Sequence, residues 1–238
     1  MRSSLPLICA LTLSCCRCAP ALTAAPICPL PSGLDAAWLK AGEVVLLGEQ
    51  HHTFECPRFA GQVLCAAAKD RPVVLGLELE GTEQARLDAY LAGGPASDLV
   101  AGGFWQRVPG DGRESQAMLE LITRARELTS AGRAVKVIAI DTDPAGNRDL
   151  GMATTVLAAR AAAPDAPVVV LVGNVHVRKT LAVHKTLAWH LLAARVPIHS
   201  VNLVGGGELT PPFDAQLDLS PLTIAPPARE SVSAPRAP

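Results

Sequence analysis

Short runs of apolar residues recur along the chain and are separated by longer segments of mixed character. Five such runs stand out, at residues 43–47, 72–77, 135–140, 168–172 and 198–203. They are rich in Val, Leu and Ile and show little alternation with polar residues. This pattern is typical of strands buried on both faces, as in a parallel sheet.

The segments between the runs place apolar residues at helical spacing. We predict helices at residues 57–68, 82–91, 114–131, 148–163 and 185–195, with a shorter one at residues 35–41. Pro57 suits a first helical turn, and Gly132 suits the end of a helix. Strands that alternate with helices predict an α/β fold, with a mostly parallel sheet covered by helices on both faces. A chain of 238 residues can form this as a single domain.

Two segments do not fit this alternation. Residues 96–112 contain several Gly and Pro residues together with Phe104 and Trp105, which is consistent either with a cap over the strand ends or with a surface loop. From residue 209 the chain is rich in proline. We expect its end, from Pro226, to be disordered.

The N-terminus has the features of an export signal. Arg2 precedes an apolar stretch at residues 5–13 that is too short to span a bilayer, and Ala19-Pro20-Ala21 forms a small-residue cleavage site. Residues 1–21 are therefore predicted to be a signal peptide, with cleavage after residue 25 as an alternative. Acylation of Cys15 or Cys16 would instead give a lipoprotein. Residues 22–42 then form a lead-in to an α/β domain at 43–208, in a protein located in the periplasm or at the outer membrane.

Three cysteines remain after removal of such a signal, namely Cys28, Cys56 and Cys65. An oxidising compartment permits a disulfide between Cys28 and either of the other two, and three unpaired thiols are the alternative. The formal net charge is −1 and no basic stripe is present, which argues against nucleic-acid binding. Glycine-rich nucleotide fingerprints are also absent from the sequence.

The candidate chemistry lies where apolar runs end. Gly48-Glu49-Gln50-His51 follows the first run, and Gly173-Asn174-Val175-His176 follows the fourth. Between them, the second run ends in Glu78. Because parallel strands place their carboxyl ends at one edge of the sheet, we expect His51, Glu78 and His176 to converge. Each glycine is expected either to permit a sharp turn or to let a ligand approach the backbone.

Two imidazoles and one carboxylate suit three kinds of site. They are ligands for a divalent transition metal, histidine ligates haem iron, and both residue types serve in acid–base hydrolysis. Further candidates surround these three. They are Glu49, His52, Glu80, Asp141, Asp143 and Arg148. Asp149 is most simply explained as stabilising a helix N-terminus.

The order of these motifs resembles a known family. GEQH, GLELE, a helix bearing Gln84, Leu87, Asp88, Tyr90 and Leu91, then Arg148-Asp149 and VGNVH are similar to the ChaN-like haem-binding uptake proteins of the Tiki superfamily, across residues 44–204. That superfamily includes TraB-type proteins and resembles erythromycin esterases. The resemblance implies His51, Glu78 and His176 as shared site residues. Tyrosine is a haem ligand in the ChaN type, and Tyr90 is the single tyrosine here.

Three functions follow as alternatives. The first is an exported protein that binds haem or a metal in iron uptake, with a possible outer-membrane receptor. The second is a metal-dependent hydrolase of protease or esterase type, in which His51 or a bound metal activates water with help from Glu78. The third is a partner-binding envelope protein that retains the site as a relic.

Overall fold

A computed structural model of the chain describes residues 27–143, 146–180, 184–204 and 213–233. The predicted signal peptide, its cleavage sites and the four cysteines within it lie outside the described residues. So does the glycine run at residues 205–207.

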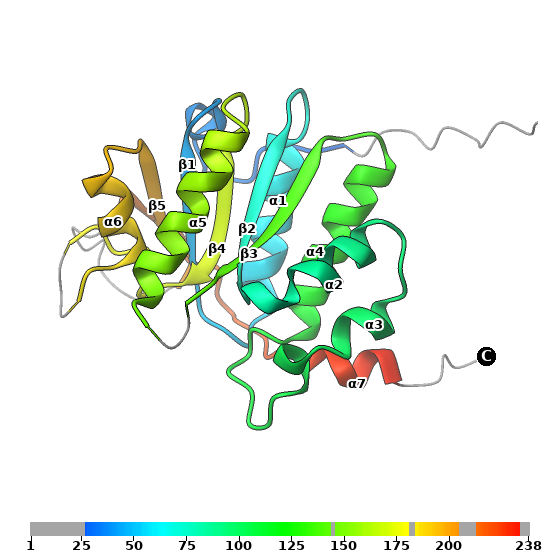
Figure 1. Ribbon diagram of the computed structural model, residues 1–238. Coiled ribbons are helices and arrows are strands. Elements are labelled where there is room, and N and C mark those ends of the chain that lie inside the picture. Colours follow the sequence, from blue (N-terminus) through cyan, green and yellow to red (C-terminus); the bar gives the residue numbers. More distant parts are fainter. Residues whose placement is uncertain (1–26, 144–145, 181–183, 205–212, 234–238) are drawn as a thin grey trace, which may run out of the picture.

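The described chain folds around one parallel sheet (Figure 1). Its strands are β1 (Val44–Glu49), β2 (Val73–Glu80), β3 (Val135–Asp141), β4 (Val168–Gly173), β5 (Ile198–Asn202) and β6 (Ala215–Gln216). They lie in the order β3-β2-β4-β1-β5-β6, and every adjacent pair is parallel. The predicted α/β fold with a parallel sheet is confirmed.

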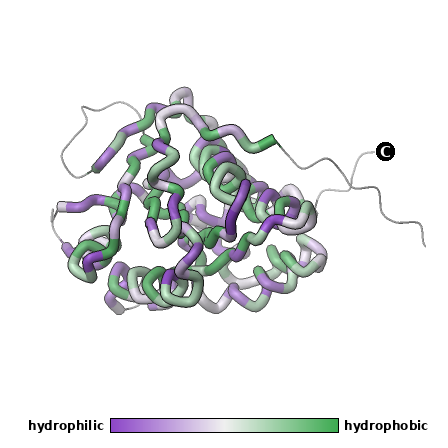
Figure 2. The backbone as a smooth tube through the Cα atoms, turned by 90° about the horizontal axis from the view of Figure 1, so that it is seen from above, coloured by the Kyte–Doolittle hydropathy of each residue, from purple (hydrophilic) through white to green (hydrophobic). Residues whose placement is uncertain are grey.

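Helices cover both faces of the sheet. They are α1 (Glu55–Ala67), α2 (Gln84–Leu91), α3 (Ala96–Val100), α4 (Gln116–Ser130), α5 (Arg148–Ala162), α6 (Leu187–Ala193) and α7 (Ala228–Ser233), with 3-10 turns η1 (Ala36–Leu39), η2 (Gly81–Glu83) and η3 (Gly103–Gln106). Alternate strand residues enter two separate cores: Val45 and Leu47 pack with α1 to α4, whereas Val44 and Leu46 pack with α5 and α6. In Figure 2, hydrophobic and hydrophilic residues alternate along the helices, as expected where one face is buried.

The strand order positions the candidate site. β2, β4 and β1 are adjacent in the sheet although β3 separates β2 from β4 in sequence. The residues that end these three strands therefore share one edge. β2 also extends beyond the predicted residue 77, to Glu80, and its pairing with β3 shifts register between Leu77 and Glu80. Glutamate is uncommon in strands, so the sequence pattern placed the strand end too early.

The C-terminal tail is ordered where the composition predicts disorder. Beyond Pro226, α7 packs with Ala228 fully buried in the core that contains α1 to α4. β6 adds a short strand to the edge of the sheet. The prediction of a disordered end was wrong for residues 226–233, because composition alone does not register contacts with distant loops.

Cys28 and Cys65 form a disulfide, one of the alternatives left open by the sequence. It ties the lead-in segment to α1. Cys56 is a free, buried thiol, and burial raises its pKa. Among the helices of the described residues, none has the length and apolar character needed to cross a membrane.

Candidate functional site

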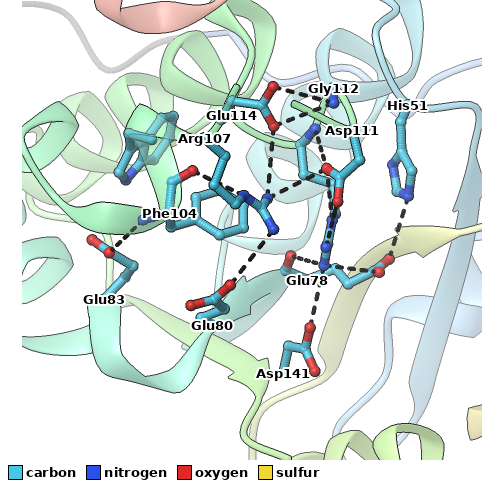
Figure 3. Close-up of polar contacts among 12 residues, drawn as sticks. His51, Glu78, Glu80, Glu83, Phe104, Arg107, Asp111, Gly112, Glu114 and Asp141 are labelled. Carbon is cyan, nitrogen blue, oxygen red and sulfur yellow. Dashed lines mark hydrogen bonds and ion pairs between the residues drawn. The ribbon is translucent and has the colours of Figure 1, made fainter. Parts of the chain in front are cut away.

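Three predicted site residues meet at the carboxyl edge of the sheet. His51 lies just beyond β1, Glu78 lies near the end of β2, and His176 lies three residues beyond β4. The Nε2 atom of His51 is 3.9 Å from Oε2 of Glu78, and the Nε2 atom of His176 is 3.8 Å from Oε1 of the same carboxylate. The two imidazoles thus approach one buried carboxylate, each from its own strand. Figure 3 shows His51 and Glu78 in this arrangement.

Each imidazole is oriented by a second carboxylate at its other nitrogen. Nδ1 of His51 is 2.9 Å from Glu49, and Nδ1 of His176 is 2.7 Å from Asp149. A carboxylate only accepts hydrogen bonds, so both Nδ1 atoms carry the proton. In a neutral imidazole this leaves the lone pair on Nε2, on the side facing Glu78.

The charges around His51 and Asp149 shift their pKa values. Burial of His51 opposes protonation, but the hydrogen bond and negative charge of Glu49, with the charge of Glu78, outweigh it and raise the pKa of His51 above 6.5. Burial likewise raises the pKa of Asp149, but the bond and charge of His176 outweigh it, so the net pKa is lowered. The surroundings of His51 and Asp149 therefore favour the charged form of each.

Glu78 is fully engaged by donors. Its Oε1 accepts hydrogen bonds from Arg113 at 3.1 Å and from Arg148, and its Oε2 accepts one from the backbone N–H of Gly173 at 2.6 Å. This carboxylate has no exposed surface, so these donors take the place of water around its oxygens. Its negative charge lies between two guanidinium groups and two imidazoles.

Asp141 completes this charge network at the end of β3. Its Oδ2 accepts hydrogen bonds from Arg113 at 3.2 Å and from Nε of Arg148 at 2.8 Å. Burial acts to lower the pKa values of both arginines, but their hydrogen bonds outweigh it and both pKa values are raised. The bond to Asp111 contributes most for Arg113 and the bond to Asp141 contributes most for Arg148, and the charge of Glu78 adds to each. Asp141 therefore holds the two arginines against Glu78.

The glycines of the two G-x-x-H motifs let the motifs interlock. A Cβ atom on Gly48 would lie 2.5 Å from Val177 and 3.0 Å from the Cα atom of Asn174, and one on Gly173 would lie 3.1 Å from Nε2 of His51. Neither glycine has a positive φ. The expected sharp turn therefore does not account for these glycines, whereas the close approach of Val177, Asn174 and His51 does.

The other candidate residues divide into those that join the cluster and those that lie apart from it. Arg148, Glu49 and Asp141 belong to the cluster, as described. Glu80 instead lies 3.5 Å from Arg107, and His52 packs on Gly112 with a left-handed backbone, φ 67°. Neither of these two lines the cavity next to His51 and His176. Asp143 is exposed in the segment before α5.

Tyr90, the candidate haem ligand, does not reach the cluster. It is buried between α2 and α4, where its hydroxyl is 2.8 Å from Thr123 and its ring stacks under Arg126. The packing explanation of this tyrosine accounts for all of these contacts.

Two residues of the network were not predicted to take part. Arg113, from the loop before α4, is 6% exposed and reaches both Glu78 and Asp141. Asp111 holds its guanidinium from the other side, at 2.6 Å. An arginine in a glycine-rich loop carries no sequence signal, so only the fold identifies it. Asp149 lies in the first turn of α5, as expected, and its carboxylate also accepts hydrogen bonds from His176 and from the N–H of Leu187 at the start of α6.

The cluster opens into a cavity of about 530 Å³ that is lined mostly by charged and polar residues. Its lining residues are Glu49, Gln50, His51, Glu78, Asp111, Arg113, Arg148, Gly173, Asn174, Val175 and His176. This lining suits haem poorly, because only Val175 offers an apolar side chain to a large, mostly apolar macrocycle. The described residues also include no group of three or more His, Cys, Asp or Glu side chains arranged to hold a metal ion. Glu78 is a poor third ligand for a metal ion, since its carboxylate is already paired with two arginines.

No protein-family model matches the sequence, and no curated protein matches it. A solved structure described as "Bacterial protein toxins" is similar with a TM-score of 0.47 and 17% identity, covering 68% of this chain and 34% of that one. The chain thus spans about a third of that protein. A second, described as "Cofacial heme binding to ChaN of Campylobacter jejuni", has a TM-score of 0.42 and 15% identity, covering 71% and 84%. Neither likeness bears on the site residues.

Proposed function

We propose that the protein is a hydrolase in which His51 and His176 act as paired acid–base groups on a polar substrate. One observation carries this proposal: each imidazole has Nδ1 fixed on a carboxylate and Nε2 on the side of Glu78, and both rings line the same cavity. This is the arrangement that a general base needs, because it fixes both the ring orientation and the tautomer.

His51 is the group we assign to water activation. Its side chain is 26% exposed, against 14% for His176, so it has the better access to solvent. Taking a proton at Nε2 creates an imidazolium that Glu49 stabilises at Nδ1. Its pKa is raised, so Nε2 of His51 is a stronger proton acceptor than a free imidazole. A protonated His176, held at Nδ1 by Asp149, then gives its Nε2 proton to the leaving group, and the proton that His51 takes from water balances this transfer.

Glu78 takes a different role from the proton acceptor that the sequence suggests. Both of its oxygens accept hydrogen bonds from the protein, so it is not free to take a proton from water. We assign it to positioning: it holds Arg148 at the cavity wall and places negative charge near both Nε2 atoms. Arg148, 29% exposed, offers positive charge to an oxyanion formed during hydrolysis.

The experiment is a hydrolysis screen with matched histidine variants. Purified protein is assayed on chromogenic carboxylic esters, amides and phosphate esters. H51A and H176A should each lower kcat on any substrate that is turned over by on the order of a hundred-fold or more. H199A is the control, because His199 also pairs with a glutamate, Glu43 at 3.0 Å, in a different part of the sheet. Equal rates for wild type and the H51A/H176A double variant would exclude this function.

Haem or metal binding is the second candidate, supported by the same imidazole geometry. Metal-ligating histidines are also commonly oriented by a carboxylate at the nitrogen away from the metal. Iron or a divalent metal would then bind at Nε2 of His51 and His176. Titration with haem and with Zn²⁺ tests this, and H51A and H176A should each weaken binding strongly while H199A does not. Retained affinity in both variants would reject it.

Export, a role in iron uptake and membership of the Tiki superfamily remain proposals that rest on the sequence. Mass spectrometry of the mature N-terminus tests export: loss of residues 1–21 supports a signal peptide, and an acylated cysteine supports the lipoprotein form. An intact Met1 on protein recovered from the cell envelope would contradict both forms. If neither hydrolysis nor ligand binding is found, these results favour the third alternative, a partner-binding envelope protein that retains the site as a relic.

A further inference from the structure

The end of the chain contacts the loop that carries His51. The segment concerned, residues 223–229, is named here the C-terminal strap. The N–H of Phe54 donates to the carbonyl of Thr223 at 3.0 Å, and the N–H of Ala225 donates to the carbonyl of His52 at 2.7 Å. Glu55, at the start of α1, accepts from the N–H of Thr223 at 2.8 Å. These bonds fix the backbone immediately after His51.

The same strap holds the loop that carries Arg113. The N–H of Gln116 donates to Pro226 at 2.8 Å, and the N–H of Ala228 donates to Glu114 at 2.9 Å. Nη1 of Arg229 donates to the carbonyls of Arg107 at 3.1 Å and Trp105 at 3.3 Å. Bonds thus secure both ends of residues 105–116, and in Figure 1 α7 lies beside this part of the chain.

The two loops also touch each other directly. A Cβ atom on Gly112 would lie 2.3 Å from the His52 ring and 2.5 Å from its backbone nitrogen. Any shift of residues 105–116 relative to residues 50–55 would disturb this packing. The strap is bonded to both loops, so it sets their relative position.

A continuous set of ion pairs leads from this loop to the site (Figure 3). Arg107 lies against Phe104 and pairs with Asp111 at 3.4 Å, and Asp111 binds Arg113 at 2.6 Å. Arg113 in turn binds Glu78 at 3.1 Å. The position of Arg113, and through it that of Glu78, therefore depends on the backbone that Arg229 holds.

We infer that Arg229 is a positioning residue for the site. By binding the carbonyls of Trp105 and Arg107, it keeps Arg113 on Glu78, between the two histidines. This inference rests on the proposed function only for its effect on catalysis. Its effect on the loop is independent of any activity.

The experiment compares R229A, R229K and E230A in the full chain. E230A is the control, because Glu230 is an exposed neighbour on α7. We expect R229A to increase amide hydrogen exchange of residues 105–116 and to lower kcat by about tenfold or more, with a smaller change in KM, because displaced catalytic groups cost rate. R229K should recover most of kcat, since a single nitrogen makes both native bonds. If R229A does not fold, R229M replaces it, because Met keeps the packing of the side-chain stem.

The outcomes separate the two claims. Unchanged exchange of residues 105–116 in R229A, or equal changes in R229A and E230A, would overturn the role of Arg229. Faster exchange with full kcat would also overturn it, because the loop would then not position the site. If no substrate is hydrolysed by wild type, the proposed function fails, and faster exchange limited to residues 105–116 in R229A still supports the strap as the support of this loop.

Discussion

At the scale of single residues, the candidate site consists of two imidazoles and the carboxylates that contact them. Glu49 and Asp149 each fix one histidine, while Glu78 faces both. Arg113 and Arg148 offset part of this negative charge. The pKa of His51 is thus set by neighbours that the fold holds in place, and substitution of those neighbours should change it in a defined direction.

We expect E49Q to lower the pKa of His51, because glutamine keeps the size of the side chain but removes its charge. Histidine NMR titration measures this directly. E43Q is the matched control, since Glu43 pairs with His199 and not with His51. A His51 pKa that is the same in wild type and E49Q would contradict the assignment.

The same pair predicts how stability depends on pH. The folded-state pKa of His51 is raised, so its contribution to the free energy of unfolding is fully present below pH 6.5 and is lost as pH rises through the folded-state value. Denaturant titrations of wild type and E49Q should therefore differ more at pH 5.5 than at pH 8.5. A difference that grows with pH would be the wrong sign.

Asp149 predicts the opposite pH dependence. Its pKa is lowered, so its stabilisation is present above pH 3.8 and is lost as pH falls through the folded-state value. D149N should destabilise the protein at pH 7 by about 1–3 kcal/mol, through the bonds to His176 and Leu187. Chemical denaturation measures this, with the exposed D165N as control. Equal stability of D149N and D165N at pH 7 would contradict it.

At the scale of elements, the loops after β1 and β4 pack on each other's strands. Gly48 leaves room for Asn174 and Val177, and Gly173 leaves room for His51. The two G-x-x-H motifs therefore form one unit across neighbouring strands. This explains why each glycine precedes its histidine without requiring a special backbone conformation.

We expect G48A to destabilise the protein by about 1–3 kcal/mol, because the added methyl group overlaps both a side chain and backbone. Thermal or chemical unfolding measures the change. G103A is the control, since a Cβ there would meet no atom within 4 Å. Relief by the G48A/V177A double variant should be partial, because the contact with the backbone of Asn174 remains. Wild-type stability of G48A would show that the loop can move away.

The helices and strands that could be predicted are those with a clear local pattern of apolar residues. The five runs gave β1 to β5 because each is rich in Val, Leu and Ile, and α4 was clear from its amphipathic spacing. β6 and α7 were missed. Both are short, and they depend on contacts with residues far away in the sequence, so no local periodicity marks them.

At the scale of the whole molecule, long-range links tie the chain ends to the domain. The disulfide joins Cys28 to Cys65 across 37 residues, and the C-terminal strap lies against the loops of the site. The N-terminal lead-in and the C-terminal strap are thereby fixed to elements that the strands position.

We expect C28S to lower the free energy of unfolding of the oxidised protein by about 3–4 kcal/mol, from the loop-closure entropy of a segment of this length. Chemical denaturation with and without a reductant measures this. The reductant should destabilise wild type but leave C28S unchanged, which serves as the internal control. Equal stability of oxidised wild type and C28S would contradict a structural role for the bridge.

The sequence by itself determined the α/β class, the positions of the main strands and the convergence of His51, Glu78 and His176. These follow from local hydrophobicity and from the polarity of parallel strands, both of which are readable along the chain. Only the tertiary structure decided that β2, β4 and β1 are neighbours, that Arg113 enters the cluster and Tyr90 does not, and that the tail supports the site. The reason is physical: strand order and loop contacts depend on packing between residues distant in sequence, and such packing leaves no periodic trace in the chain.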